Sequence, residues 1–347
     1  MENIIKGQKY DIVIGADLTE IIKVAINAPD TFLITDSNVA GLYGGLTRAE
    51  KYILPAGERN KTLSNVEKIC EAMLAAGCGR KTTVVALGGG VVGDIAGFAA
   101  SVYMRGVKVI QIPTTLMAMT DSSIGGKTGV NSAAKNIIGA FHQPSAVLLS
   151  LNFLKTLPQK ELICGMGEIF KTALLDTRIY AGFQTLIKNI KTGKAGPQIE
   201  IDGLSEIIRM CAAFKLDVVT RDEKETSLRK TLNVGHTLGH AFETYDKYRL
   251  SHGEYIIHGI RLEAEIAKDI GLIDGGHYNA IRETCALLTC GKKLPLDIDG
   301  LVALCAFDKK NCGVGISIML SIAAGKTEEV VLKAEELGRA LGRIRLK

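Results

Sequence analysis

The sequence lacks the features of a membrane or secreted protein. None of its apolar runs approaches the roughly 20 residues that span a bilayer. The first residues, MENIIKGQKYDIVIG, lack the long apolar core and the small-residue cleavage site of a signal peptide. Eight cysteines are present, but none forms a CxxC pair, which argues against a zinc–cysteine site and is typical of free thiols in a reducing compartment. We therefore expect a cytoplasmic protein.

A strong charge of one sign is also missing. The net charge is only +5, which is too small to indicate nucleic-acid binding. It does fit a small anionic substrate, if basic side chains converge in one cleft. With 347 residues, of which 47% are hydrophobic and 23% charged, the chain is long enough for two domains with a sizeable core. We see no internal repeat.

The first half of the chain alternates strand-like and helix-like segments. An amphipathic helix is predicted around 63–76, and its apolar face would hold Val66, Ile69, Cys70, Met73 and Leu74. Nearly continuous apolar strands separated by helices indicate a mostly parallel sheet covered on both sides, so we expect an α/β nucleotide-binding domain. The predicted strands are 10–15, 31–36, 51–57, 82–90 and 107–115.

The second half is dominated by helical periodicity. Residues 191–197 are interpreted as a flexible surface loop. The boundary should fall near 151–160, which gives an α/β domain over 1–158 and a mainly α-helical domain over 159–347. The predicted helices are 161–175, 204–219, 235–245, 258–270 and 277–288.

A glycine-rich loop follows the strand that ends near residue 88. The segment GGGVVGD matches GxGxxG between a strand and a helix, where backbone N–H groups can approach a pyrophosphate. Alone this is a weak signal, and a tight structural turn explains it nearly as well. The acid expected about 20 residues later is absent. If a dinucleotide binds, Asp36 or Glu58 would hold its adenosine ribose.

Histidines are scarce, but three of the six fall within a short stretch. His236 and His240 are four residues apart and would share a helix face, and His252 follows. This clustering favours a metal or acid–base site over structural histidines. Thr237 stands where the HExxH motif has glutamate, which disfavours a zinc protease.

A catalytic divalent metal usually takes three protein ligands and keeps one position open. Glu168 is a candidate for the third ligand, because it lies among apolar residues where a solvated acid would be out of place. The alternative is a buried ion pair between Glu168 and Lys171.

Six motifs in order resemble the 3-dehydroquinate synthase family. The resemblance runs from about residue 10 to about residue 325, which makes it far more specific than a single glycine loop. The motifs are GGGVVGDIAGFAASVYMRG, IPTTLMAMTDSSIGGKTGVN, GMGEIFKTALL, LNVGHTLGHAFE, SHGEYIIHG and FDKKNCG.

The resemblance implies an N-terminal α/β nucleotide-binding domain and a helical C-terminal domain, with the active site between them. It implies a lyase that converts 3-deoxy-D-arabino-heptulosonate 7-phosphate into 3-dehydroquinate and phosphate, using catalytic NAD and zinc or cobalt. The implied metal ligands are Glu168, His236 and His252. His240 matches an active-site histidine that is not a ligand and would transfer a proton or bind phosphate.

The resemblance also implies two further groups of residues. Those that contact NAD would be Asp36, Asn38, Glu58, Lys61, Gly89, Gly90, Asp94, Thr114, Thr115, Lys127, Lys135, Phe153, Thr156 and Glu161. Those that hold the phosphate and carboxylate of the substrate would be Lys127, Lys135, Asn136, Lys171, Lys215, Arg229, Asn233, Lys309 and Lys310. Arg105 resembles an arginine that reaches across a homodimer interface to the phosphate site.

This chain departs from the family pattern in two places. The loop between Lys127 and Lys135 is one residue shorter than usual, which bears on the reach of Lys135. Tyr255 and His258 are unusual after His252, and we interpret both as packing variation.

Two other functions stay open. Another sugar-phosphate cyclase, making a deoxy-inosose or valiolone ring, would lack the substrate carboxylate, whereas Lys215, Arg229 and Asn233 are all retained here. A metal-dependent polyol or alcohol dehydrogenase of related fold would release NADH and would not need the basic cluster. A regulatory or scaffold role is disfavoured, because each expected metal and cationic position is present.

Overall fold

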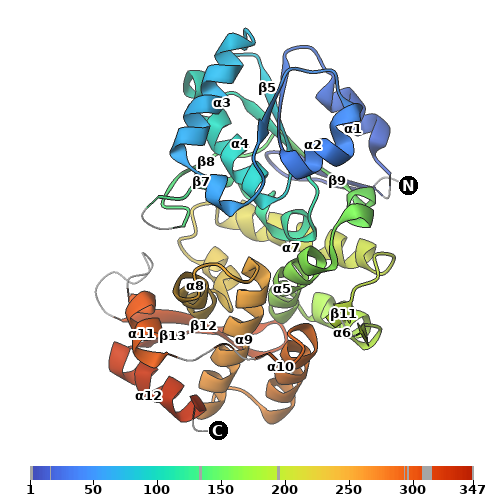
Figure 1. Cartoon of the computed structure of the whole chain (residues 1–347). Helices are drawn as coiled ribbons and strands as arrows, with labels where there is room; N and C mark the ends of the chain where they lie inside the picture. The colour runs from blue at the N-terminus through green and yellow to red at the C-terminus, as the bar shows by residue number, and fades with distance from the viewer. Residues whose placement is uncertain are drawn as a thin grey trace. The chain divides into compact units, whose positions relative to one another are not determined.

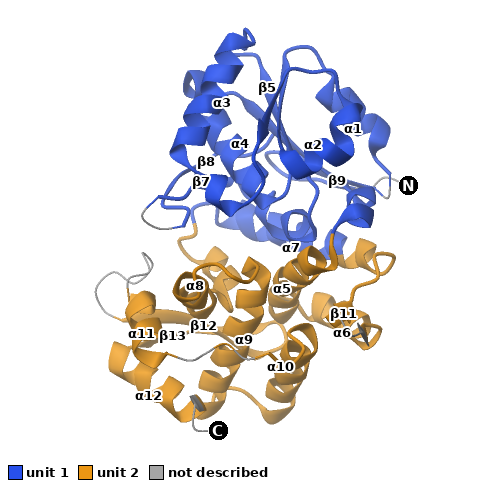
Figure 2. Ribbon diagram, in the orientation of Figure 1, with its two compact units in different colours: residues 1–157, 208–224 blue, residues 158–207, 225–347 orange. Residues whose placement is uncertain are grey.

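The computed structural model describes residues 3–15, 17–132, 135–193, 196–292, 294, 297–306 and 315–345. By its contacts the chain divides into two compact units, shown in different colours in Figure 2. Unit 1 comprises Met1–Leu157 and Ile208–Lys224, and unit 2 comprises Pro158–Ile207 and Glu225–Lys347. The predicted single division after residue 158 stays a prediction, since this grouping assigns residues 208–224 to unit 1.

Unit 1 is built on a seven-stranded sheet with the order β1-β2-β9-β6-β5-β3-β4 (Figure 1). The edge strand β1 pairs antiparallel with β2, and every other pairing in the sheet is parallel. The strands are β1 (Asn3–Ile5), β2 (Asp11–Gly15), β3 (Thr31–Asp36), β4 (Lys51–Leu54), β5 (Thr83–Gly88), β6 (Lys108–Pro113) and β9 (Ala146–Ser150). The expected mostly parallel sheet is confirmed.

Helices cover this sheet because each presents an apolar stripe to it. In α3, Val66, Ile69 and Met73 are buried at helical spacing, as predicted. Cys70 is partly buried, but Leu74, which was expected on the same face, is exposed. The side chain of Thr62 accepts from the Asn65 N–H to cap the first turn. The helices of unit 1 are α1 (Thr19–Ile26), α2 (Ser37–Tyr43), α3 (Leu63–Ala75), α4 (Gly90–Val102) and most of α7 (Leu204–Arg221). A separate antiparallel pair is formed by β7 (Lys127–Val130) and β8 (Ile138–Phe141). Short helical turns are η1 (Gly44–Leu46), η2 (Glu58–Asn60), η3 (Tyr103–Arg105), η4 (Ala118–Ser122) and η5 (Leu151–Thr156).

Unit 2 is mainly helical, as expected, with two small hairpins. One hairpin, β12 (Ile316–Ala323) with β13 (Lys326–Leu332), joins α8, α9, α11 and α12 in a common apolar core. The other pairs β10 (Lys191–Gly193) with β11 (Gly196–Gln198). The helices are α5 (Gln159–Leu175), α6 (Thr177–Lys188), α8 (His236–Tyr245), α9 (His252–Asp269), α10 (Gly275–Leu288), α11 (Ile298–Ala306), α12 (Ala334–Arg345) and the short η6 (Leu228–Asn233).

Two sequence-based assignments in unit 2 need correction. The helix predicted over 258–270 begins six residues earlier, at His252, because Ser251 and Glu254 form a capping box at its first turn. Residues 191–197 were expected to be a loop, but β10 and β11 form there. The pattern also did not predict α6, α12 or the β12–β13 hairpin.

Three helices of unit 2 meet at glycines. A Cβ at Gly253 of α9 would overlap the carbonyl oxygen of Cys164 in α5, and a Cβ at Gly167 would overlap the carbonyl of Gly253. In the same way, a Cβ at Gly259 would overlap the carbonyl of Gly235, just before α8. The backbones of α5 and α8 therefore both lie directly against α9.

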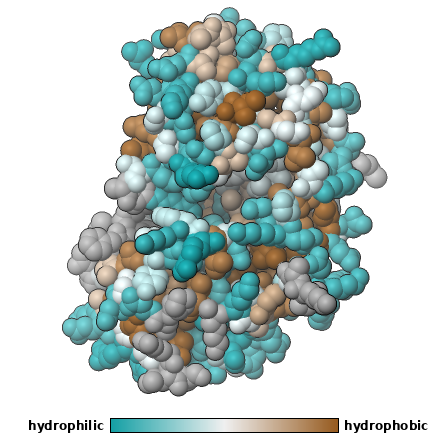
Figure 3. Space-filling model, viewed as in Figure 1, coloured by the Kyte–Doolittle hydropathy of each residue, from teal (hydrophilic) through white to brown (hydrophobic). Residues whose placement is uncertain are grey.

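On the face seen in Figure 3, apolar residues form small groups among hydrophilic ones. No helix in the described ranges is both long and apolar enough to cross a membrane.

We predict that Gly253→Ala lowers the melting temperature strongly, because the added methyl group would push α5 and α9 apart. Overpacking of this kind costs about 1–3 kcal/mol or more. Gly182→Ala is the matched control, since Gly182 is exposed on α6 and a Cβ there meets no atom within 4 Å. That control should be neutral or slightly stabilising. Equal melting temperatures for the two variants in thermal unfolding would contradict the close approach.

Candidate active site

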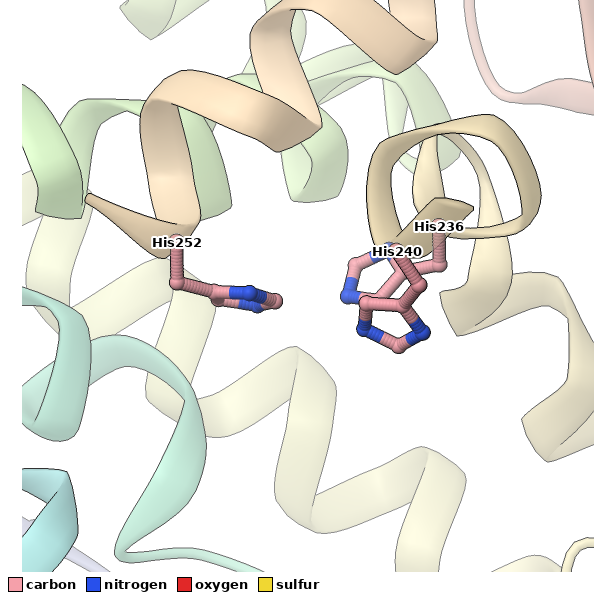
Figure 4. A group of neighbouring side chains, drawn as sticks. All are labelled: His236, His240 and His252. Carbon is pink, nitrogen blue, oxygen red and sulfur yellow. The ribbon is translucent and has the colours of Figure 1, made fainter. Parts of the chain in front are cut away.

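Three histidines gather at the starts of two helices of unit 2. His236 opens α8, His240 lies one turn later, and His252 opens α9. One ring nitrogen from each lies within 4.8 Å of the others. In Figure 4 the ring of His252 points toward the other two. The three histidines that are close in the sequence therefore also lie together in space, and their role in a metal or acid–base site stays a prediction.

Glu168 faces two of these rings from the middle of α5. Its side chain is buried, and its Oε1 lies 3.2 Å from Nε2 of His252 and 3.6 Å from Nε2 of His236. Its Oε2 lies 2.6 Å from Nζ of Lys171. The ion pair foreseen as the alternative to a metal site is therefore present, and the same carboxylate also meets the histidines.

The hydrogen-bonding of the rings decides which nitrogen is available. Nδ1 of His236 lies 3.0 Å from the carbonyl oxygen of Val234, which can only accept, so Nδ1 carries the hydrogen. Nδ1 of His252 lies 3.2 Å from Oε2 of Glu243. When these Nδ1 atoms carry hydrogens, both Nε2 lone pairs point at the carboxylate of Glu168. Lone pairs facing a carboxylate require a proton or a cation between them.

This donor set fits a divalent metal of the zinc or cobalt type, which accepts neutral imidazole and carboxylate ligands. Glu168, His236 and His252 would leave a further position open. His240 is also close enough to bind, so the choice of three ligands stays a prediction. Cys164 of α5 accepts from the N–H of Gly253, the residue after His252, and burial raises the pKa of its thiol to about 11.

Glu168 is ionised despite its burial. Burial alone would raise the pKa of this carboxyl, but Lys171, followed by the two facing histidines, holds it well below its ordinary value of 4.5. A carboxylate that is charged at neutral pH is ready to bind a cation.

The other predicted substrate residues of unit 2 occupy the η6 turn that leads into α8. Arg229 is fully buried, and the side chain of Asn233 donates to Oε1 of Glu225 at 2.9 Å. Lys309 and Lys310 lie outside the described residues.

In unit 1, several predicted site residues meet around Lys61. This buried lysine forms an ion pair with Asp94 on α4, and its Nζ lies 2.5 Å from Oδ1 of Asn136. Burial raises the pKa of Asp94 although Lys61 opposes the rise. The positive charge of Lys135, the residue before Asn136, also opposes this rise in the pKa of Asp94.

Another predicted cation, Lys215, lies in the part of α7 that belongs to unit 1. Its Nζ lies 2.8 Å from Oδ1 of Asp121, in the turn η4. Lys127 is the first residue of β7, and Arg105 is exposed at the end of η3.

The predicted nucleotide residues lie mostly at the carboxyl ends of parallel strands. Gly89 precedes α4, and a Cβ on it would lie 2.9 Å from Cγ2 of Thr115, so the glycine loop is pressed against the loop after β6. Thr114 donates its N–H to the Gly88 carbonyl. Strand ends of this kind are the usual place for a dinucleotide in an open parallel sheet.

Asp36 ends β3 and caps α2, accepting from the N–H groups of Asn38 and Val39. Phe153 and Thr156 of η5 both contact Tyr43, by an edge-on ring packing at 4.8 Å and a hydroxyl contact at 2.5 Å. The remaining predicted residues are Glu58 in η2, Gly90 at the start of α4, and Glu161, which is in α5 of unit 2.

Sequence reasoning missed three acids at these sites. Asp121 pairs with Lys215, Glu225 accepts from Asn233, and Glu243 contacts His252. Asp121 lies in the motif IPTTLMAMTDSSIGGKTGVN, and Glu243 ends the motif LNVGHTLGHAFE. Their positions in these motifs could have identified both acids as site residues.

Solved structures define the class of this fold. The chain is similar to a 2-deoxy-scyllo-inosose synthase solved with carbaglucose-6-phosphate, NAD⁺ and Co²⁺, at 25% identity and TM-score 0.84 over 99% of both chains. It is also similar to a 2-epi-5-epi-valiolone synthase from Streptomyces hygroscopicus solved with NAD⁺ and Zn²⁺, at 26% identity and TM-score 0.85 over 99% of both chains. A probable glycerol dehydrogenase from Sinorhizobium meliloti shares only the fold, at 14% identity and TM-score 0.58 over 96% of this chain and 95% of that one.

Sequence comparison narrows the class to one family. The profiles described as 3-dehydroquinate synthase N-terminal and C-terminal match residues 51–164 and 165–311. A 3-dehydroquinate synthase of Alkaliphilus metalliredigens is 43% identical over 96% of this chain and 95% of its own length. One of Ruminiclostridium cellulolyticum is 37% identical over 96% of this chain and 95% of its own. The chain belongs to the 3-dehydroquinate synthase family, as the motifs predicted.

We predict that Lys171→Met destabilises the metal-free protein by about 3–5 kcal/mol at pH 7, because it leaves the Glu168 carboxylate buried without its main cation. Adding Glu168→Gln to Lys171→Met should recover much of the loss, since the uncompensated charge is then gone. Denaturant unfolding of the four members of this cycle measures the effect.

The sign of the pH dependence follows from the lowered pKa of Glu168. Its stabilisation is fully present above about pH 4.5 and is lost as the pH falls through the lower folded value. The penalty of Lys171→Met should therefore shrink in acid. Strictly additive effects of the two substitutions at pH 7 would contradict the ion pair.

Proposed function

We propose that this protein converts 3-deoxy-D-arabino-heptulosonate 7-phosphate into 3-dehydroquinate and phosphate, as a carbon–oxygen lyase that uses NAD and a divalent metal. The observation that supports this most strongly is the carboxylate of Glu168 facing Nε2 of both His236 and His252 in a member of this family. A divalent metal held there could polarise a substrate hydroxyl.

Glu168, His236 and His252 would hold the metal, and the predicted residues at the strand ends of unit 1 would hold NAD. When bound, NAD can accept and return a hydride and the metal can polarise a substrate hydroxyl. The two cyclases solved with NAD⁺ and Co²⁺ or Zn²⁺ support both groups.

The chain's own cations would bind and orient the two anionic ends of the substrate. The buried guanidinium of Arg229 suits a carboxylate, because its paired N–H groups match the two oxygens. Lys171 sits beside the metal ligand Glu168, so its ammonium would lie near substrate oxygens at the same centre. His240, within reach of both ligand histidines, would transfer a proton or donate a hydrogen bond to the phosphate.

Arg229 and Asn233 favour a substrate with a carboxylate over the substrates of the related cyclases, which lack one. Arg229 and Asn233 lie together in η6, and Asn233 is held by Glu225. A dehydrogenase of related fold would have no use for this buried guanidinium. A homodimer, with Arg105 reaching a partner's phosphate site, and a cytoplasmic location stay predictions.

We predict phosphate and dehydroquinate in equal amounts when the purified protein is given the heptulosonate phosphate, Zn²⁺ or Co²⁺ and less than one equivalent of NAD⁺ per substrate. NAD is regenerated within each cycle, so no NADH should accumulate. Treatment with a chelator should abolish the reaction, and either metal should restore it. A phosphate assay measures the phosphate released, and absorbance at the NADH maximum measures any NADH that accumulates.

Arg229→Met should reduce the rate with this substrate at least about 100-fold, because it leaves a carboxylate unpaired. The matched control is Arg221→Met, since Arg221 is exposed at the end of α7 and forms an ion pair with Asp217 on the same helix. NADH formed in proportion to substrate without phosphate release would instead identify a dehydrogenase.

A further inference from the structure

Glu243 is a buried acid that the function described so far does not use. It lies in the last turn of α8, seven residues after His236, and only 5% of its surface is exposed. A buried carboxylate is costly unless charged or polar donors face it. Its described side-chain contact is with Nδ1 of His252, at 3.2 Å.

The ring of His252 is thus held between two carboxylates from two different helices. Glu243 of α8 meets its Nδ1, and Glu168 of α5 meets its Nε2, each at 3.2 Å. His236 differs, because its Nδ1 faces the backbone carbonyl of Val234. The partner of Nδ1 in His236 is a backbone carbonyl, which a substitution cannot remove. The partner of Nδ1 in His252 is a side chain, which a substitution can change.

We propose that Glu243 is a positioning residue for the metal ligand His252. This rests on the proposed function, because it presumes the metal centre. A carboxylate that accepts the Nδ1 hydrogen fixes the tautomer and the orientation of the ring, and makes Nε2 a stronger donor to the metal. In this role Glu243 acts through His252 and not on the reacting atoms.

The connection between α8 and α9 is built to keep the two residues facing each other. The hydroxyl of Tyr255 donates to Oδ2 of Asp246 at 2.7 Å and accepts from the N–H of Leu250 at 3.0 Å. Asp246 also accepts from Nε of Arg249 at 2.8 Å. Tyr255, expected to be only a packing variation, therefore ties down the turn between Glu243 and His252.

The test is the affinity of the full-length protein for Zn²⁺ and Co²⁺, measured by competition with a chromophoric chelator. Glu243→Gln keeps the shape of the side chain but loses its charge, and should weaken metal binding about 10- to 100-fold. The matched control is Glu265→Gln, because Glu265 is a half-buried acid of α9 whose carboxylate accepts from Tyr278. That variant should bind metal as the unaltered protein does.

Two further measurements separate the possible outcomes. Cooperative thermal unfolding of Glu243→Gln, with a melting temperature near that of the unaltered protein, would show that unit 2, which contains Glu243, is folded. The affinity for NAD should also be unchanged. In the unaltered Co²⁺ protein, NMR should show a slowly exchanging, paramagnetically shifted Nδ1–H from His252. This readout serves even if the variant fails to fold.

Equal metal affinity in Glu243→Gln and the unaltered protein, while His252→Ala binds weakly, would overturn the positioning role and leave the metal centre intact. A rapidly exchanging Nδ1–H on His252 would also overturn it. If the unaltered protein binds neither metal, and His252→Ala changes nothing, the proposed metal centre fails together with this role.

Discussion

The backbone of α9 lies against the backbones of α5 and α8 at positions where only glycine fits. Gly253 meets α5, and Gly259 meets the residue before α8. Because the contacts are backbone to backbone, a side chain at the start of one helix reaches the middle of another. Glu168, His236 and His252 are brought together in this way, although they are far apart in the sequence. The proposed metal chemistry depends on this packing.

Charge balance at the centre follows from the same packing. Lys171 keeps Glu168 ionised in a buried place, and the two outer partners of the histidines, the carbonyl of Val234 and the carboxylate of Glu243, direct both Nε2 atoms inward. A buried carboxylate with two imidazole lone pairs directed at it is an arrangement completed by a cation. The tautomers, and not only the proximity of the rings, make a metal centre the natural interpretation.

Much of this could be predicted from the sequence, for identifiable reasons. Apolar runs and the amphipathic α3 revealed the parallel sheet, and the spacing of His236 and His240 revealed one helix face. The start of α9 at His252 was missed because apolar periodicity is weak there, while a capping box sets the boundary. Glu243 and Asp121 were missed because their partners, His252 and Lys215, are distant in the chain or on another element. Pairings between elements come from packing, which local patterns do not contain.

The measurement that tests the account most directly is a crystal structure of the Zn²⁺-loaded protein, with anomalous diffraction data recorded at the zinc absorption edge. The account predicts one strong peak per chain, bonded to a carboxylate oxygen of Glu168 and to Nε2 of His236 and His252, at about 2.0–2.2 Å. His240 should be unbonded, and Nδ1 of His252 should keep its contact with Glu243. A zinc ion held by the three histidines without Glu168, or located away from these residues, would contradict it.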